Sequence, residues 1–152
     1  MFSLFYFETM GGFINMLKWK DTFSCNIAEI DNQHKRLFEL GGKIFDAASL
    51  KDDYDHYDEI MEILNELTEY TVYHFKFEED LMTKYGYSNF ETHKFEHDFF
   101  VKKVQKIGKR DLEGAQNEAL LEIVEFVANW VAEHILKTDM QYKDFFNSKG
   151  IY

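Results

Sequence analysis

The sequence predicts an all-α fold, an antiparallel up-down-up-down four-helix bundle preceded by an N-terminal arm. Apolar residues recur at helical spacing in four separate stretches of the chain. The 152 residues include no proline, the strongest helix breaker. No stretch of useful length alternates apolar and polar residues as a strand would. Four amphipathic helices joined by short polar turns bury their apolar stripes by packing into a bundle.

The first two helices are separated by the polar segment SLKDDYDHYD. Asp31 is a suitable N-terminal cap for the first helix. The stripe of that helix consists of Ile30, His34, Leu37, Phe38, Ile44 and Phe45. The second helix is expected to end at Gly86, because glycine readily adopts the left-handed conformation of a C-terminal cap. Its stripe consists of Ile60, Leu64, Leu67, Thr71, His74, Glu78, Leu81 and Tyr85.

The third and fourth helices follow the same pattern. The third is expected to begin near Phe90, and its stripe consists of His93, His97, Phe100, Val104 and Ile107. The segment GKRDLEGAQN is predicted to be a loop. The stripe of the fourth helix consists of Leu120, Val124, Val127, Val131 and His134, with Trp130 and Ile135 beside it.

The composition excludes some classes of partner and favours the cytoplasm. The formal net charge is −11, whereas nucleic acids and anionic membranes are bound by basic surfaces, so neither is an expected partner. Cys25 is the single cysteine, which leaves no internal disulfide, and a free thiol suits a reducing compartment.

Residues 1–15 are interpreted as an N-terminal extension, and residues 16–152 as the bundle domain. The segment MFSLFYFETMGGFIN is apolar, but it lacks the basic start and small-residue cleavage site of a secretory signal. It is also too short to span a bilayer. Met16 follows directly and is a candidate for the natural start of the chain.

Five of the six histidines lie on the predicted core stripes. His93 and His97 are four residues apart, as are His74 and Glu78, so each pair emerges on one face of its helix. His34 and His134 each occur once, on the first and fourth helices. The sixth histidine, His56, lies in an acidic segment off the pattern and is expected to be a solvated surface residue.

A lone histidine on an apolar face is usually a hydrogen-bonded core residue, and an HxxxH pair alone is equally compatible with either role. Burying five imidazoles in one core without partners is costly, however, and a metal that ligates one nitrogen of each ring removes the cost. Five nitrogens exceed the needs of one zinc. With bridging carboxylates they suit two octahedral ions with one position left over, which favours iron or manganese.

The ligand pattern differs from that of ferritin-like di-iron enzymes. Those proteins use Glu-x-x-His on two helices, which gives a site rich in carboxylates. No glutamate lies three residues before any histidine of this chain. The predicted site is instead rich in nitrogen.

This pattern resembles the hemerythrin family, in particular its single-domain bacterial members. The matching segments are IDNQH at 30–34, HFKFEE at 74–79, HKFEH at 93–97 and HILKTD at 134–139. Trp19, in the segment MLKWKD, also resembles the aromatic residue of the family's N-terminal arm. The resemblance extends from about Met16 to the end of the chain.

The resemblance implies two iron ions (Fe²⁺ or Fe³⁺) joined by a solvent-derived oxo or hydroxo group. His93, His97 and His134 would hold one iron. His34 and His74 would hold the other and leave it five-coordinate. Glu78 and Asp139 would bridge the two.

The role of Asp139 comes from the resemblance and not from periodicity. His134 and Asp139 are five residues apart, so an ideal α-helix would turn them about 140° from each other. A bridging Asp139 therefore requires a local irregularity, such as a π-bulge or the helix end.

The resemblance further implies a non-enzymatic protein that binds dioxygen reversibly, for storage, transport or delivery. An unidentified protein that accepts the oxygen or exchanges electrons is then a candidate partner. Few carboxylates limit the stabilisation of highly oxidised iron, which favours binding over oxygen cleavage. An apolar pocket would keep water out. The candidates for its wall, for which plain core packing is the competing interpretation, are Leu37, Phe38, Trp130, Val131 and Ile135.

Three alternatives remain at this point. A sensor of oxygen, nitric oxide or redox state would act through a partner, and a fused signalling domain would favour it. A di-iron oxidase or peroxidase would need an acid-base residue beside the open iron, and the sequence indicates none there. A structural bundle without metal is the third.

Overall fold

The computed structural model describes residues 18–49, 56–108 and 116–152. Within them the chain forms a short 3₁₀ turn and four long helices, and it contains no strand. In order these are η1 (Asp21–Phe23), α2 (Ala28–Ser49), α3 (Tyr57–Tyr85), α4 (Phe90–Gly108) and α5 (Gln116–Glu133). The last helix continues through η3 (His134–Thr138) and η4 (Asp139–Tyr142) into α6 (Lys143–Ser148).

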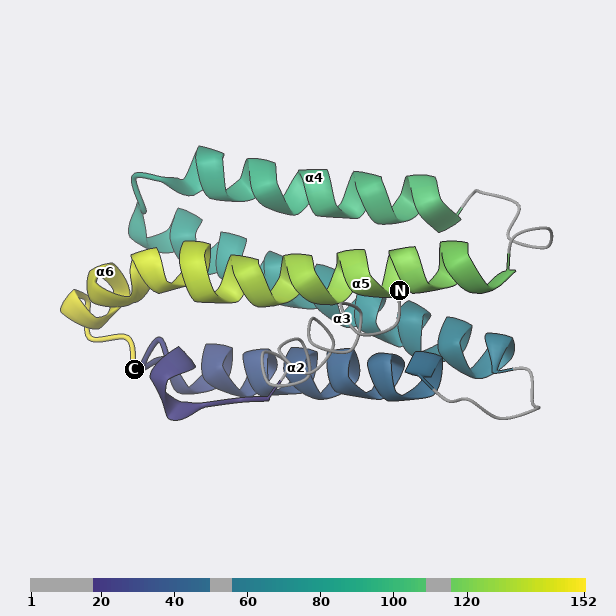
Figure 1. Cartoon of the computed structure of the whole chain (residues 1–152). Coiled ribbons are helices and arrows are strands. Elements are labelled where there is room, and N and C mark those ends of the chain that lie inside the picture. Colours follow the sequence, from purple (N-terminus) through teal and green to yellow (C-terminus); the bar gives the residue numbers. More distant parts are fainter. Residues whose placement is uncertain (1–17, 50–55, 109–115) are drawn as a thin grey trace, which may run out of the picture.

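The four long helices form the predicted antiparallel bundle. Each runs opposite to the one before it, and α2 and α4 lie on either side of α5 (Figure 1). Helix α2 packs against α3 and α5, and α4 packs against the same two helices. Gly86 ends α3 with a φ of 70°, in the left-handed region, as its position in the sequence predicts. The fold class is therefore confirmed.

The predicted cap of the first helix is wrong. Helix α2 begins at Ala28, so Asp31 lies inside its first turn. The Asp31 carboxylate instead accepts a hydrogen bond from the backbone N–H of Cys25, at 2.9 Å, and another from its thiol, at 3.2 Å. The Ser24 hydroxyl donates to the same carboxylate. Asp31 thus holds the preceding segment against the helix, because its side chain points back toward the N-terminus.

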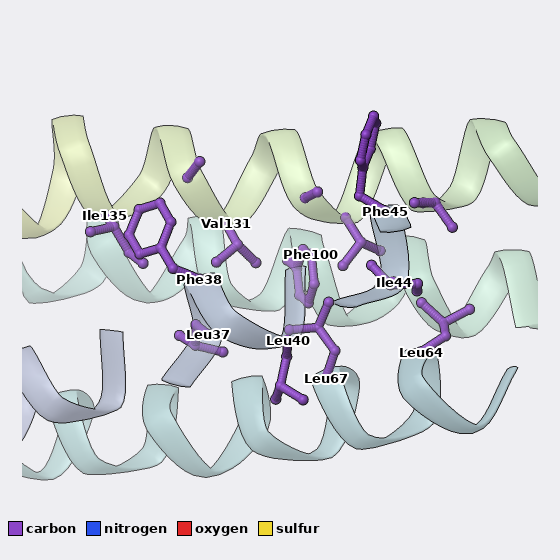
Figure 2. Packing of buried hydrophobic residues seen from close by; sticks show 14 of the residues in the cluster. Leu37, Phe38, Leu40, Ile44, Phe45, Leu64, Leu67, Phe100, Val131 and Ile135 are labelled. Carbon is purple, nitrogen blue, oxygen red and sulfur yellow. The ribbon is translucent and has the colours of Figure 1, made fainter. Parts of the chain in front are cut away.

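Two apolar clusters fill the described part of the bundle. The larger lies in the interior of the bundle and includes Leu37, Leu40, Ile44, Leu67, Phe100 and Val131 (Figure 2). The smaller lies near the chain's C-terminal end and consists of Cys25, Ile27, Ile30, Met82, Tyr87, Tyr142 and Phe146. On each of the four long helices and its continuation, the side chains that are predicted to bind metal lie between residues of the larger cluster and residues of the smaller cluster.

The N-terminal arm packs on the larger cluster. The Trp19 ring lies edge-on to Phe23 and to Phe38, with centroid distances of 6.1 and 6.2 Å. The expectation for residues 1–15 and most of the predicted loop GKRDLEGAQN lie outside the described residues. Among the helices of the described ranges, none is both long and apolar enough to cross a membrane.

Candidate metal centre

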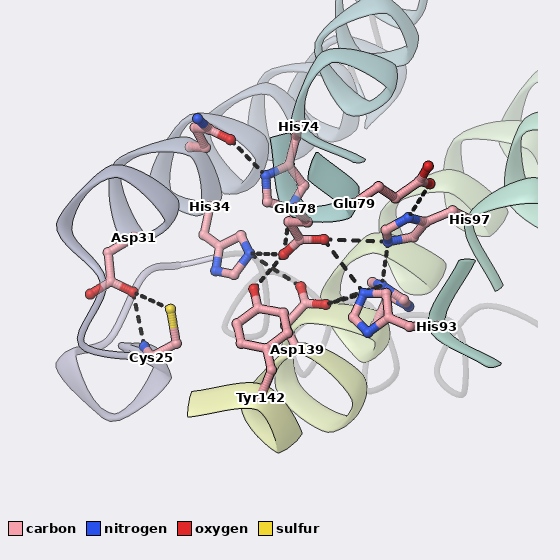
Figure 3. Close-up of polar contacts among 12 residues, drawn as sticks. Cys25, Asp31, His34, His74, Glu78, Glu79, His93, His97, Asp139 and Tyr142 are labelled. Carbon is pink, nitrogen blue, oxygen red and sulfur yellow. Dashed lines mark hydrogen bonds and ion pairs between the residues drawn. The ribbon is translucent and has the colours of Figure 1, made fainter. Parts of the chain in front are cut away.

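The five histidines of the core stripes meet near one end of the bundle, together with Glu78 and Asp139 (Figure 3). At this end α2 and α4 begin, α3 finishes, and α5 passes into η3 and η4. Helical spacing places each side chain on the inner face of its own helix, so the bundle brings four separate faces to one point. None of the seven residues is more than 4% exposed.

Glu78 faces histidines on both sides of the site. Its Oε1 atom lies 3.4 Å from Nε2 of His74 and 3.7 Å from Nε2 of His34. Its Oε2 atom lies 3.3 Å from Nε2 of His97 and 3.5 Å from Nε2 of His93. One carboxylate therefore stands between two groups of histidines. We call His34 and His74 the two-histidine half, and His93, His97 and His134 the three-histidine half.

Asp139 repeats this arrangement. Its Oδ2 atom lies 3.1 Å from Nε2 of His34, in the two-histidine half. Its Oδ1 atom lies 3.1 Å from Nε2 of His134 and 3.2 Å from Nε2 of His93, in the three-histidine half. Two sets of donor atoms, each close enough to surround one ion, consequently share both carboxylates.

The chain between His134 and Asp139 is π-helical. A π-turn accommodates one more residue than an α-turn, so two side chains five residues apart reach the same face. The predicted irregularity is thereby confirmed. The same rearrangement leads into the 3₁₀ turn η4, which brings Tyr142 to the site.

The ring nitrogens that face inward converge closely. The Nε2 atoms of His97 and His134 are 3.0 Å apart, and those of His134 and His93 are 3.2 Å apart. The outer nitrogens of two of these rings face carboxylates: His97 Nδ1 lies 2.9 Å from Glu79 and His134 Nδ1 lies 2.8 Å from Glu96. When those outer nitrogens carry the proton, the inner ones present lone pairs to one another. A cation between them removes the repulsion.

Several buried polar atoms in the centre lack a hydrogen-bond partner. Among the described residues these atoms are His34 Nδ1 and Nε2, His74 Nε2, Glu78 Oε2, and both carboxylate oxygens of Asp139. Unsatisfied buried polar groups are costly and demand an explanation. All of them except His34 Nδ1 point into the shared centre, and imidazole and carboxylate together suit iron or manganese. The residues present therefore fit a pair of metal ions.

The electrostatics of the centre also favour cations. Burial opposes ionisation of Glu78 and Asp139, but the surrounding imidazoles hold the pKa of each carboxyl well below its ordinary value. Burial by itself would lower the pKa of His93, yet Asp139 and Glu78 beside it raise that pKa to about 10. Burial outweighs the same carboxylates at His74 and lowers its pKa to about 4, so this ring is neutral and ready to ligate.

Sequence reasoning missed one side chain in the centre. Tyr142 is fully buried and donates its hydroxyl to Oε1 of Glu78. Its ring is inclined by 29° to the His93 ring, at a centroid distance of 5.7 Å. Burial and the charges of Asp139 and Glu78 raise the pKa of its hydroxyl well above the ordinary value. Tyr142 follows Asp139 by three residues, a spacing that places two side chains on the same face of a helix. The sequence could have indicated Tyr142 in this way, once Asp139 is accepted as a site residue.

The other predicted residues fall into two groups. His56 lies just before α3, beside the exposed Glu59 and away from the centre, in agreement with the prediction. The candidate wall residues Leu37, Phe38, Val131 and Ile135 are buried in the larger apolar cluster. Trp130 is half-buried and stacks on His134, with a centroid distance of 4.5 Å and an interplanar angle of 11°.

Comparison with known proteins gives a consistent result. Residues 25–146 match the family model of the hemerythrin HHE cation binding domain. The chain is 41% identical over 129 residues to a bacteriohemerythrin of Clostridium acetobutylicum, an alignment covering 85% of this chain and all of that protein. It is 35% identical over 120 residues to a bacteriohemerythrin of Methylococcus capsulatus, covering 79% of this chain and 88% of the relative.

A solved structure agrees with these sequence comparisons. A wild-type hemerythrin crystal structure superposes with a TM-score of 0.71 and 34% identity, covering 84% of this chain and 95% of that one. The range matched by the family model, residues 25–146, contains all seven residues of the centre. On these grounds the chain belongs to the hemerythrin family.

Proposed function

We propose that this protein binds dioxygen reversibly at a di-iron centre and serves to store, carry or deliver it. The observation that supports this most strongly is that Glu78 and Asp139 each present one oxygen to the two-histidine half and the other to the three-histidine half. A carboxylate placed in this way is suited to join two ions. The proposed ligands are His34, His74, Glu78, His93, His97, His134 and Asp139.

At the level of the family, the chain is a di-iron, oxygen-binding protein. When bound, a ferrous pair supplies the redox chemistry by which dioxygen is held and released. In our assignment the three-histidine half and both carboxylates would hold one iron. The two-histidine half, with one nitrogen fewer, would hold the other iron together with the same carboxylates and would leave room for the ligand.

The protein around the centre is suited to exclude water. The larger apolar cluster borders it on one side and the smaller cluster on the other. We assign the oxygen pocket wall to Leu37, Phe38, Val131 and Ile135, which are buried beside the ligands on α2 and on the continuous rod of α5 and η3. Trp130, stacked on His134, completes the wall on the side of the three-histidine half. Exclusion of water protects a reactive ligand from proton leakage.

The site is better suited to binding than to turnover. An oxidase or peroxidase requires a group that gives protons to reduced oxygen near neutral pH. The buried hydroxyl of Tyr142 is engaged by Glu78 and has a pKa raised well above its ordinary value, so it retains its proton. We also place the protein in the cytoplasm, which is supported by the buried free thiol of Cys25.

The proposal is tested by an anaerobic oxygen titration with metal analysis on the same sample. Protein from iron-replete cells is expected to contain about two irons per folded chain. The reduced protein is expected to develop a visible absorption band on addition of oxygen and to lose it on evacuation, over repeated cycles. Absence of iron would refute the proposal. Irreversible oxidation with release of hydrogen peroxide would replace it with an oxidase.

A further inference from the structure

The outer nitrogens of the three-histidine half face ionisable carboxyl groups. His97 Nδ1 lies 2.9 Å from Oε1 of Glu79, and His134 Nδ1 lies 2.8 Å from Oε2 of Glu96. An ionised carboxylate only accepts hydrogen bonds, so both rings donate an N–H outward and turn their lone pairs toward the centre. Neither Glu79 nor Glu96 faces the centre itself.

The outer nitrogens of the two-histidine half differ in their hydrogen-bond partners. His74 Nδ1 lies 2.9 Å from Oε1 of Gln33. The amide orientation of Gln33 is fixed because its Nε2 donates to Glu29 at 2.9 Å, which leaves Oε1 to accept from the ring. His34 Nδ1 is buried and has no hydrogen-bond partner among the described residues. The Asp31 carboxylate lies within 4.8 Å of a ring nitrogen of His34, but it accepts its hydrogen bonds from Ser24 and Cys25. Among the described residues, neither ring of this half is hydrogen-bonded to a carboxylate through its outer nitrogen.

We propose that Glu79 and Glu96 strengthen the three-histidine half as a metal donor, so that the centre fills in a fixed order with this half first. The inference rests on the ligand assignment of the proposed function. Negative charge behind an imidazole raises the basicity of the nitrogen that faces the metal. Removing such a partner typically costs about 10–100-fold in metal affinity. Two hydrogen-bonded carboxylates behind one half and none hydrogen-bonded behind the other produce unequal sites.

Both residues act through another side chain and are positioning residues. Glu79 is partly shielded by Lys94, whose Nζ lies 3.5 Å from Oε2. Glu96 also accepts a hydrogen bond from the Thr138 hydroxyl at 2.8 Å, which orients it toward His134. The order of filling has a consequence for function. A chain with one ion would hold it in the three-histidine half, and a second ion in the two-histidine half would be needed before the proposed oxygen site is complete.

The three-histidine half also offers one more ring nitrogen to a metal than the two-histidine half. The test must therefore separate the effect of the two carboxylates from the effect of this extra ligand. Glu79→Gln and Glu96→Gln keep an acceptor oxygen behind each ring and remove only the charge. The matched control is Glu133→Gln. Glu133 lines the same surface groove of about 220 Å³ as Glu96, but its carboxylate pairs with Lys137, at 3.3 Å. A fourth protein combines Glu29→Gln with Gln33→Glu, which moves a carboxylate behind His74 without changing net charge.

The experiment is an oxygen-free titration of the metal-free full chain with Co²⁺, followed by visible absorption and calorimetry. The wild-type protein is expected to bind two ions in two resolved steps. Glu79→Gln and Glu96→Gln should each weaken the first step by about 10–100-fold, while Glu133→Gln leaves both steps unchanged. The protein that combines Glu29→Gln with Gln33→Glu should bind the second ion more tightly, by a similar factor.

Two kinds of failure are distinguishable. A wild-type chain that takes up one ion or none contradicts the proposed function itself. A wild-type chain that takes up two ions with equal affinity, or glutamine variants that titrate like the Glu133→Gln control, overturns the inference and leaves the proposed function in place. The two single variants leave the buried centre unaltered, so circular dichroism should match that of the wild type before any titration is compared.

Discussion

Asp139 Oδ1 lies 3.1 Å from Nε2 of His134, five residues earlier in the chain, because a π-helical segment separates the two residues. In an ideal α-helix they would be turned about 140° apart. The geometry of the shared centre therefore depends on the length of one helical turn.

The length of this turn gives the first prediction. Inserting an alanine after Lys137, whose side chain is 71% exposed, should remove Asp139 from the centre, because a sixth residue adds about 100° of rotation. Deleting Lys137 should be tolerated, because a spacing of four returns both residues to one face of an α-helix. Metal analysis is expected to give two ions per chain for the deletion and fewer for the insertion. Two ions in the insertion variant would refute this dependence.

The second prediction compares a histidine of the centre with His56, which lies outside it. His74→Ala removes a buried ring from the two-histidine half and should reduce the iron content from about two per chain to about one, with loss of oxygen binding. His56→Ala affects a ring that is 21% exposed, beside Glu59 and away from the centre, and should change neither property. Iron analysis and the oxygen titration on both variants measure this. Equal behaviour of the two proteins would contradict the assignment.

The third prediction concerns Tyr142. Tyr142→Phe removes the hydroxyl that donates to the buried carboxylate of Glu78. A lost hydrogen bond to a charged buried acceptor costs about 1.5–3 kcal/mol, so the free energy of unfolding of the metal-free protein should fall by about that amount. Urea unfolding measures the change. Tyr152→Phe, at a residue 68% exposed, is the control and should alter stability by less than about 0.5 kcal/mol.

The fourth prediction concerns the reactivity of Cys25. Burial, and then the negative charge of Asp31, raise the pKa of this thiol, so the reactive thiolate is scarce at pH 8. Iodoacetamide should modify the folded protein at least ~100-fold more slowly than the urea-unfolded chain at that pH. Asp31→Asn should accelerate the reaction, because it removes the charge that opposes thiolate formation. Rapid labelling of the folded wild-type chain would show that the thiol is accessible and activated.

Much of the fold could be predicted because its signals are local. Four apolar stripes without proline predict four helices, and the glycine at position 86 predicts the end of α3. The start of α2 could not be predicted, because Asp31 has the residue type and position expected of an N-terminal cap. Its carboxylate instead accepts a hydrogen bond from the backbone N–H of Cys25, which lies before the helix. An aspartate here can cap the helix or accept hydrogen bonds from the preceding segment. The path of that segment decides between the two, and the local sequence does not determine this path.

The residues of the candidate site also differ in whether a local signal indicates them. Helical spacing indicated the histidines and Glu78, because their partners lie on the same stripes. Asp139 required the family resemblance, since periodicity argues against it. The partners of the outer nitrogens were missed entirely: Gln33, Glu79 and Glu96 each contact a histidine of a neighbouring helix. Contacts of this kind depend on the register between helices, which a single sequence does not encode in its spacing.

Glu78 and Asp139 are expected to join two metal ions between the histidine halves. An anomalous-difference map at the iron edge, from crystals of protein produced in iron-replete cells, tests this arrangement most directly. Two peaks are expected, one bordered by His34 and His74 and the other by His93, His97 and His134, with both carboxylates between them. A single peak, or iron bound away from these side chains, would contradict it.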